Sequence, residues 1–151
     1  MRPGLLAALG LVALGLFFVA GAGNAEEGLR RTHRGGGVTI DVTPLPAKGG
    51  SQDLRFSVRM DTHSVALDDY DMVKASLLRN GRGRAVRAGA WADPTGGGHH
   101  REGVLVFPLK EKEGTSVLTE GAQFIEVVIR DVAGVPERVF RWNLPLNTNA
   151  R

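Results

Sequence analysis

The chain has 151 residues, 42% of them hydrophobic and only 6% aromatic, with a formal net charge of +3 and no cysteine. This length suits one domain with a single core, and the lack of cysteine excludes disulfides, thiolate nucleophiles, iron–sulfur clusters and blue-copper centres. No aromatic stripe interleaves with the basic residues, so we expect no nucleic-acid partner.

The first 25 residues have the features of a cleavable secretory signal peptide. Arg2 supplies a positive charge, residues 5–20 are apolar apart from glycine, and small residues lead to Ala25. We expect cleavage after Ala25, with Gly23 and Ala25 filling the two small pockets of signal peptidase. The protein would then be periplasmic or secreted. An uncleaved membrane anchor is the alternative, and only this alternative makes the membrane a partner, because a spanning helix needs roughly 20 residues.

Residues 26–36 are rich in arginine, and the last arginine is followed directly by Gly35, Gly36 and Gly37. This composition predicts a flexible basic arm, which would be a solvated tail or would touch an anionic surface. Loss of residues 1–25 removes only the charge of Arg2, so the mature chain would carry +2 instead of +3.

Apolar and polar residues alternate along most of the remaining chain, and alternation with period two is typical of half-buried strands. Turn-forming residues separate these segments, and we see no long helical period. The expected strands cover 38–42, 54–60, 73–78, 84–90, 104–107, 124–128 and 140–144, with 84–90 as an edge strand. We therefore predict an all-β fold, an immunoglobulin-like antiparallel β-sandwich of about seven strands, over residues 37–146, followed by a tail at 147–151.

The first segment that contains candidate metal ligands follows the strand predicted at 54–60. Alternation places Asp61 and His63 on the same outward face, where both could contact one metal ion. Several aspartates follow at positions 68, 69 and 71. The competing interpretation is structural: Asp, Thr and Ser side chains would bond to the local backbone where the strand ends.

The second segment is Gly96-Gly97-Gly98-His99-His100. Its glycines permit positive φ angles and deliver two histidines to the start of the next strand. Neighbouring residues of an extended chain point to opposite faces, so we expect one of His99 and His100 to join Asp61 and His63. Imidazole and carboxylate ligands suit Zn²⁺ or Cu²⁺ better than Ca²⁺ or Mg²⁺. The alternative is an exposed loop whose histidines bind nothing.

Three groups of residues carry a resemblance over roughly residues 37–144. They are 61–68 (DTHSVALD), Trp91 with 96–107 (GGGHHREGVLVF), and 129–142 (IRDVAGVPERVFRW). This set resembles uncharacterised secreted bacterial and archaeal domains. The resemblance implies export and a β-sandwich, and it implies no particular activity.

A weaker resemblance is to the periplasmic copper-resistance carriers of immunoglobulin-like fold. Asp61-Thr62-His63 matches their Asp-x-His motif, and Gly98-His99 with Gly103 and Phe107 matches their Gly-His…Gly…Phe pattern. The carriers also use an N-terminal histidine, whereas the predicted mature chain starts at Glu26. In the carriers, the Asp-x-His and Gly-His…Gly…Phe pieces form one motif near the C-terminus. In this chain, 35 positions separate His63 from Gly98. The resemblance implies copper carriage with histidine ligands.

The sequence therefore predicts a non-catalytic, exported metal-binding module, for copper or zinc, with Asp61, His63, His99 and His100 as ligands. The alternative is a metal-free immunoglobulin-like domain that binds a protein partner, such as an envelope protein, or another envelope component through loops or a sheet edge. A further charged cluster near the last two strands would be a partner surface or the solvated face of a hairpin. Its members are Arg130, Asp131, Glu137, Arg138 and Arg141.

Overall fold

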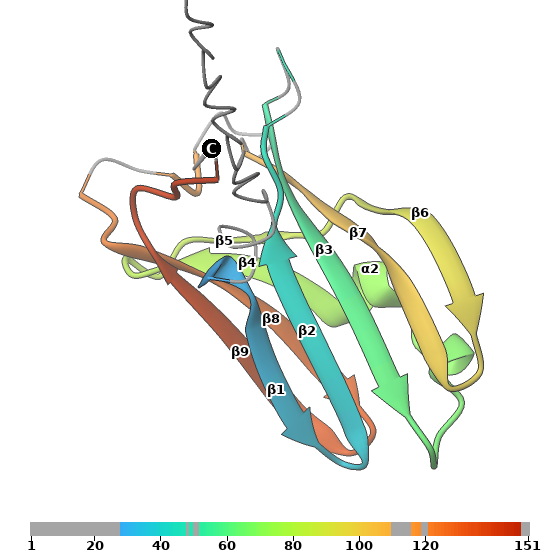
Figure 1. Ribbon diagram of the computed structural model, residues 1–151. Coiled ribbons are helices and arrows are strands. Elements are labelled where there is room, and N and C mark those ends of the chain that lie inside the picture. The colour runs from blue at the N-terminus through green and yellow to red at the C-terminus, as the bar shows by residue number, and fades with distance from the viewer. Residues whose placement is uncertain (1–27, 48, 50–51, 110–115, 119–120, 149–151) are drawn as a thin grey trace, which may run out of the picture.

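The computed structural model describes residues 28–47, 49, 52–109, 116–118 and 121–148. Within these residues, nine strands form two antiparallel sheets that pack face to face (Figure 1). The predicted antiparallel β-sandwich is therefore confirmed. The predicted signal peptide lies outside the described residues, and no helix among the described ones is long and apolar enough to cross a membrane.

The larger sheet has five strands in the order β1-β2-β3-β7-β6. Their bounds are β1 Arg31–Gly35, β2 Val38–Pro44, β3 Asp53–Thr62, β7 His100–Pro108 and β6 Ala90–Gly97. The smaller sheet has the order β5-β4-β8-β9. Its strands are β5 Ala85–Arg87, β4 Ser76–Asn80, β8 Phe124–Val132 and β9 Val135–Asn143. A single turn of 3-10 helix, η1 (Leu67–Asp69), and a one-turn helix, α2 (Met72–Ala75), lead from β3 to β4.

The core lies between the sheets and follows the alternation of the sequence. In β3, Phe56, Val58 and Met60 are fully buried, while the residues between them face outward. The ring of Phe56 meets Phe107 edge-on, with ring centroids 5.8 Å apart, and lies 5.2 Å from the ring of Trp142. Each such side chain contributes about 1.5–3 kcal/mol when buried, so these inward rows explain why the sandwich folds without disulfides.

The first correction concerns the predicted flexible arm. That prediction is wrong for residues 31–35, which form β1 and pair along their whole length with β2. The imidazole of His33 packs edge-on against Phe140, with centroids 6.3 Å apart. Arg31 Nε donates to the carbonyl oxygen of Arg141 at 3.1 Å, and Trp142 Nε1 donates to that of Leu29 at 2.6 Å. These contacts join the arm to β9 in the other sheet.

A second difference concerns the segment before the paired histidines, which lies between the strands predicted at 84–90 and 104–107 and contains the turn-forming pair Asp93-Pro94. Residues 90–97 instead form the edge strand β6. The turn-forming residues produce a local irregularity, because the register with β7 shifts between Ala92 and Thr95 and Asp93 has a φ of 49°. Such a bulge bends a strand without ending it. The nine strands thus include the predicted seven, together with β1 and β6.

Two other expected strands differ in detail. The strand expected at 73–78 starts later, at Ser76, because α2 occupies its first residues. The helix begins there because the Asp71 carboxylate accepts hydrogen bonds from the backbone nitrogens of Val73 and Lys74, both at 3.1 Å. The edge strand expected at 84–90 is confirmed as β5, in a shortened form.

The charged cluster near the last two strands divides between the two faces of β9. Arg138 points inward and is fully buried, whereas Glu137 and Arg141 point outward. Nη1 of Arg138 donates to the carbonyl oxygen of Val132 at 2.6 Å, and Nη2 donates to that of Gly35 at 2.8 Å. Burial lowers the pKa of the Arg138 guanidinium. This side chain therefore bridges the two sheets and takes no part in an exposed charged surface.

On the outer face of the smaller sheet, Glu126 is only 3% exposed and lies between two arginines. Arg79 Nε donates to its carboxylate at 2.6 Å, and Arg141 Nε donates at 2.7 Å. Burial alone would raise the pKa of Glu126, but the hydrogen bonds from Arg79 and Arg141 outweigh burial, and the pKa is lowered. Of the charged cluster, Arg141 is therefore paired with Glu126, and Arg130 is paired with Glu137.

Replacement of Arg138 by methionine tests the bridge. Met retains most of the apolar stem but leaves the carbonyl oxygens of Val132 and Gly35 without their donor, so we expect the free energy of unfolding to fall by about 2–4 kcal/mol. Urea denaturation followed by circular dichroism measures this change. Arg34→Met, at an exposed position of β1, is the control and should change little. Equal effects of the two substitutions would contradict the assigned role.

Candidate functional site

The four predicted site residues lie at one corner of the larger sheet, where β3 ends and the β6–β7 hairpin turns (Figure 1). We call Asp61, His63, His99 and His100 the histidine corner. Asp61 lies opposite His100 in the register of β3 and β7. The backbone nitrogen of Thr62, next to His63, donates to the carbonyl oxygen of His99 at 2.9 Å. The fold thus brings together two segments that are more than 30 positions apart.

Of the four residues, Asp61 and His100 are in direct side-chain contact. Nδ1 of His100 and Oδ1 of Asp61 are 2.6 Å apart, on the outward face of the sheet. His100 is 66% exposed at its side chain and Asp61 is 32% exposed. The carboxylate fixes the orientation of the ring through Nδ1, and Nε2 remains available for another partner. The structure thus brings one of the paired histidines, His100, into contact with Asp61.

A second charged pair lies beside this contact. Arg59 Nε is 3.2 Å from Oδ2 of Asp61 and 3.4 Å from Oε1 of Glu102. The hydrogen bond to His100 and the nearby Arg59 guanidinium together lower the pKa of Asp61, against an opposing contribution from burial. The corner therefore presents an ionised carboxylate whose two oxygens are both engaged.

His63 and His99 are exposed, and no hydrogen bond or ion pair of their side chains is found within the described part of the chain. His63 follows the end of β3 and His99 lies in the hairpin turn. No group of three or more His, Asp or Glu side chains in the described ranges is arranged so that it could hold a metal ion. In this conformation, the candidate ligands that are in contact with each other are therefore Asp61 and His100.

The hairpin turn owes its shape to glycine. Gly97 pairs with His100, so Gly98 and His99 are the two central residues of the turn. Gly98 has a φ of 61°, and a positive φ at the first central position alone matches a type II′ turn, which favours glycine there. The glycines therefore set the position of both histidines, as the sequence analysis anticipated.

The loop after β3 is bonded to this turn. Oδ2 of Asp68 accepts from the backbone nitrogen of Gly98 at 2.6 Å, and the backbone nitrogen of Leu67 donates to the Gly98 carbonyl oxygen at 2.8 Å. Nη1 of Arg101 donates to the carbonyl oxygens of Leu67 and Tyr70, at 2.8 and 2.7 Å. Asp68 and Arg101 thus have structural roles at the corner.

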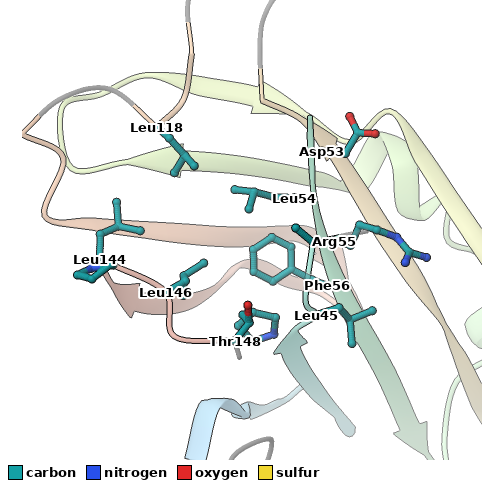
Figure 2. A pocket seen from close by; sticks show the side chains of 12 residues that line it. Leu45, Asp53, Leu54, Arg55, Phe56, Leu118, Leu144, Leu146 and Thr148 are labelled. Atoms are coloured by element: carbon teal, nitrogen blue, oxygen red, sulfur yellow. The ribbon is translucent and has the colours of Figure 1, made fainter. Parts of the chain in front are cut away.

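The structure also contains a cavity that the sequence analysis missed. It lies at the other end of the sandwich, near the start of β3, and has a volume of about 340 Å³. Five leucines surround it, at positions 45, 54, 118, 144 and 146 (Figure 2). They come from four separate segments, and no local pattern signals that such residues will meet.

Comparison with family models, with curated proteins and with solved structures finds no match to this chain. A function can therefore be proposed only from the geometry of the chain itself.

Asp61→Asn tests the electrostatics of the corner. Because the folded-state pKa of Asp61 lies below its unfolded value, about 3.9, the carboxylate stabilises the fold above that pH. This contribution is lost as the pH falls through the folded-state pKa. We expect the variant to lose under about 1 kcal/mol at pH 5–7, because the pair is partly exposed. The difference from the unmodified chain should shrink below about pH 4.

Urea denaturation over a pH series from neutral to strongly acidic measures this difference. The control is Asp69→Asn, at an exposed aspartate for which the described residues show no ion pair. A loss that stays constant down to the lowest pH would contradict the assigned interaction.

Proposed function

We propose that this protein is an exported, non-catalytic module that binds copper or zinc at the histidine corner. The observation that carries the proposal is the 2.6 Å contact between Asp61 and His100. A carboxylate bonded to one ring nitrogen of histidine is the usual support of a histidine whose other nitrogen binds a metal. His100 would bind through Nε2, with Asp61 as its orienting partner.

The other ligands would come from His63 and His99. Both are exposed, and the backbone hydrogen bond from Thr62 to His99 holds the segment of His63 beside the turn that carries His99 and His100. Imidazole ligands at about 2.0–2.1 Å suit Zn²⁺ and Cu²⁺. Metal binding would therefore draw together side chains that are separate without it.

A non-catalytic role is favoured by the surroundings of the Asp61–His100 pair. Two hydroxyls follow Asp61 in this segment: that of Thr62 is buried and donates to the carbonyl oxygen of Gly37 at 2.8 Å, and the Oγ of Ser64 lies 3.5 Å from it. The pair consequently has no adjacent nucleophile from this segment, and the chain has no cysteine. Export, to the periplasm or the exterior, is supported by the features of residues 1–25.

Titration of the full chain, without an affinity tag and after chelator treatment, with CuSO₄ or ZnCl₂ in a calorimeter tests the function. We expect one equivalent of metal and a rise in melting temperature, because the ion binds only the folded state. His100→Ala should abolish stoichiometric binding. Asp61→Asn should weaken it by about 10–100-fold, as is typical for loss of an orienting carboxylate.

The double substitution His63→Ala with His99→Ala tests the remaining ligands. It should also abolish stoichiometric uptake, whereas His33→Gln, which removes the histidine outside the corner, should leave uptake intact. Uptake that survives the double substitution would contradict the proposed ligand set.

The alternative function, a metal-free domain that binds a protein or envelope partner, is favoured by one specific observation. Asp68 and Arg101 fix the corner through backbone hydrogen bonds, so its shape does not depend on a metal. A chain that takes up neither Cu²⁺ nor Zn²⁺ in the titration would support this function in place of metal binding.

A further inference from the structure

We propose that the cavity at the end of the sandwich opposite the histidine corner binds a free, uncharged aliphatic compound, such as a medium-chain alcohol. The site is separate from the metal site proposed above: the cavity lies where β3 begins, and the histidine corner lies where β3 ends. The two proposals can therefore fail independently.

The lining of the cavity indicates an apolar occupant. Leucines from β3, from the segment after β2, from residues 116–118 and from the chain after β9 line the cavity (Figure 2). Leu54, Leu144 and Leu146 are half-buried and pack against the core, whereas Leu118 is 37% exposed and lies at the surface. Exposed apolar side chains that surround a cavity are typical of a ligand site.

Two of the residues that line the cavity, Phe56 and Leu118, are held in place by their neighbours. Phe56 is fully buried there, between Phe107 and Trp142. Leu118 is positioned by its neighbour Val117, whose carbonyl oxygen accepts from Nδ2 of Asn80 at 2.7 Å and whose nitrogen donates to the carbonyl oxygen of Leu109 at 3.1 Å. Phe56 and Leu118 are therefore each held by contacts that lie outside the cavity.

The volume limits the size of the occupant. A cavity of about 340 Å³ lies at the lower end of the range for small-molecule sites. If each carbon of a chain takes roughly 30 Å³, about the share of a water molecule in the liquid, the space holds a chain of up to about eleven carbons. A medium-chain aliphatic compound fits this limit.

The charges at the rim favour a neutral head group. Arg55 is the cation among the described lining residues, and its Nη2 lies 3.7 Å from Oδ2 of Asp93. Asp53 adds a carboxylate to the same rim, and both Asp53 and Arg55 point away from the leucines (Figure 2). Among the described lining residues, the rim therefore offers no surplus positive charge to a fatty carboxylate, whereas an alcohol needs none.

Calorimetric titration of the full chain with 1-decanol and, separately, with decanoate tests the proposal. We expect saturable binding of 1-decanol and at least about tenfold weaker binding of decanoate. Leu118→Lys places an ammonium group at the cavity and should weaken decanol binding at least about tenfold, because this charge would lose water contacts. Val139→Lys is the matched control: Val139 is 39% exposed but lies outside the cavity lining, and binding should be unchanged.

Melting temperatures of both variants establish that they are folded. The proposal is overturned if 1-decanol does not bind, if decanoate binds as tightly as decanol, or if Leu118→Lys and Val139→Lys bind decanol equally. Association with phosphatidylcholine vesicles in the absence of decanol binding also overturns it, since the apolar side chains would then serve a membrane surface.

Discussion

A buried guanidinium connects the two sheets at the end of the sandwich near the histidine corner. Arg138 belongs to β9, yet it donates to the carbonyl oxygen of Gly35 in the other sheet and to that of Val132 at the end of β8. A buried charge is costly unless it is bonded, so these carbonyl oxygens must stay where they are for the fold to persist. In a chain without disulfides, this polar bridge restricts the relative position of the sheets.

The segments near this bridge hold one another in place. The hydroxyl of Tyr70 accepts from the backbone nitrogen of Ala133, close to Val132, and the hydroxyl of Thr62 donates to the carbonyl oxygen of Gly37. The loop that carries Tyr70 is the same loop that bonds to the β6–β7 turn. The position of the histidines therefore depends on contacts that extend to β8 and β9.

Alternation of apolar residues was sufficient to predict the sandwich, because burial of one face determines which residues a strand exposes. It also placed Asp61 correctly on the outward face. The arm was misjudged because glycine and arginine are common in flexible segments, while β1 is ordered by its pairing with β2 and by side-chain contacts with β9, over 100 positions away. Arg138 was misjudged because arginine is seldom buried, and nothing in its neighbours reveals the carbonyl oxygens that it meets. Which histidine joins Asp61 depends on strand register, and the cavity depends on distant leucines.

The irregular edge strand β6 affects whether molecules of this protein can associate edge to edge. A straight, exposed edge offers unpaired backbone groups to which another chain can add a strand, and this is a common start of aggregation. In β6, the shifted register at Ala92, the positive φ of Asp93 and the missing amide hydrogen of Pro94 interrupt that edge. One edge strand of the other sheet, β5, has only three residues. At these two edges, the sandwich leaves little continuous backbone on which a second molecule can build a longer sheet.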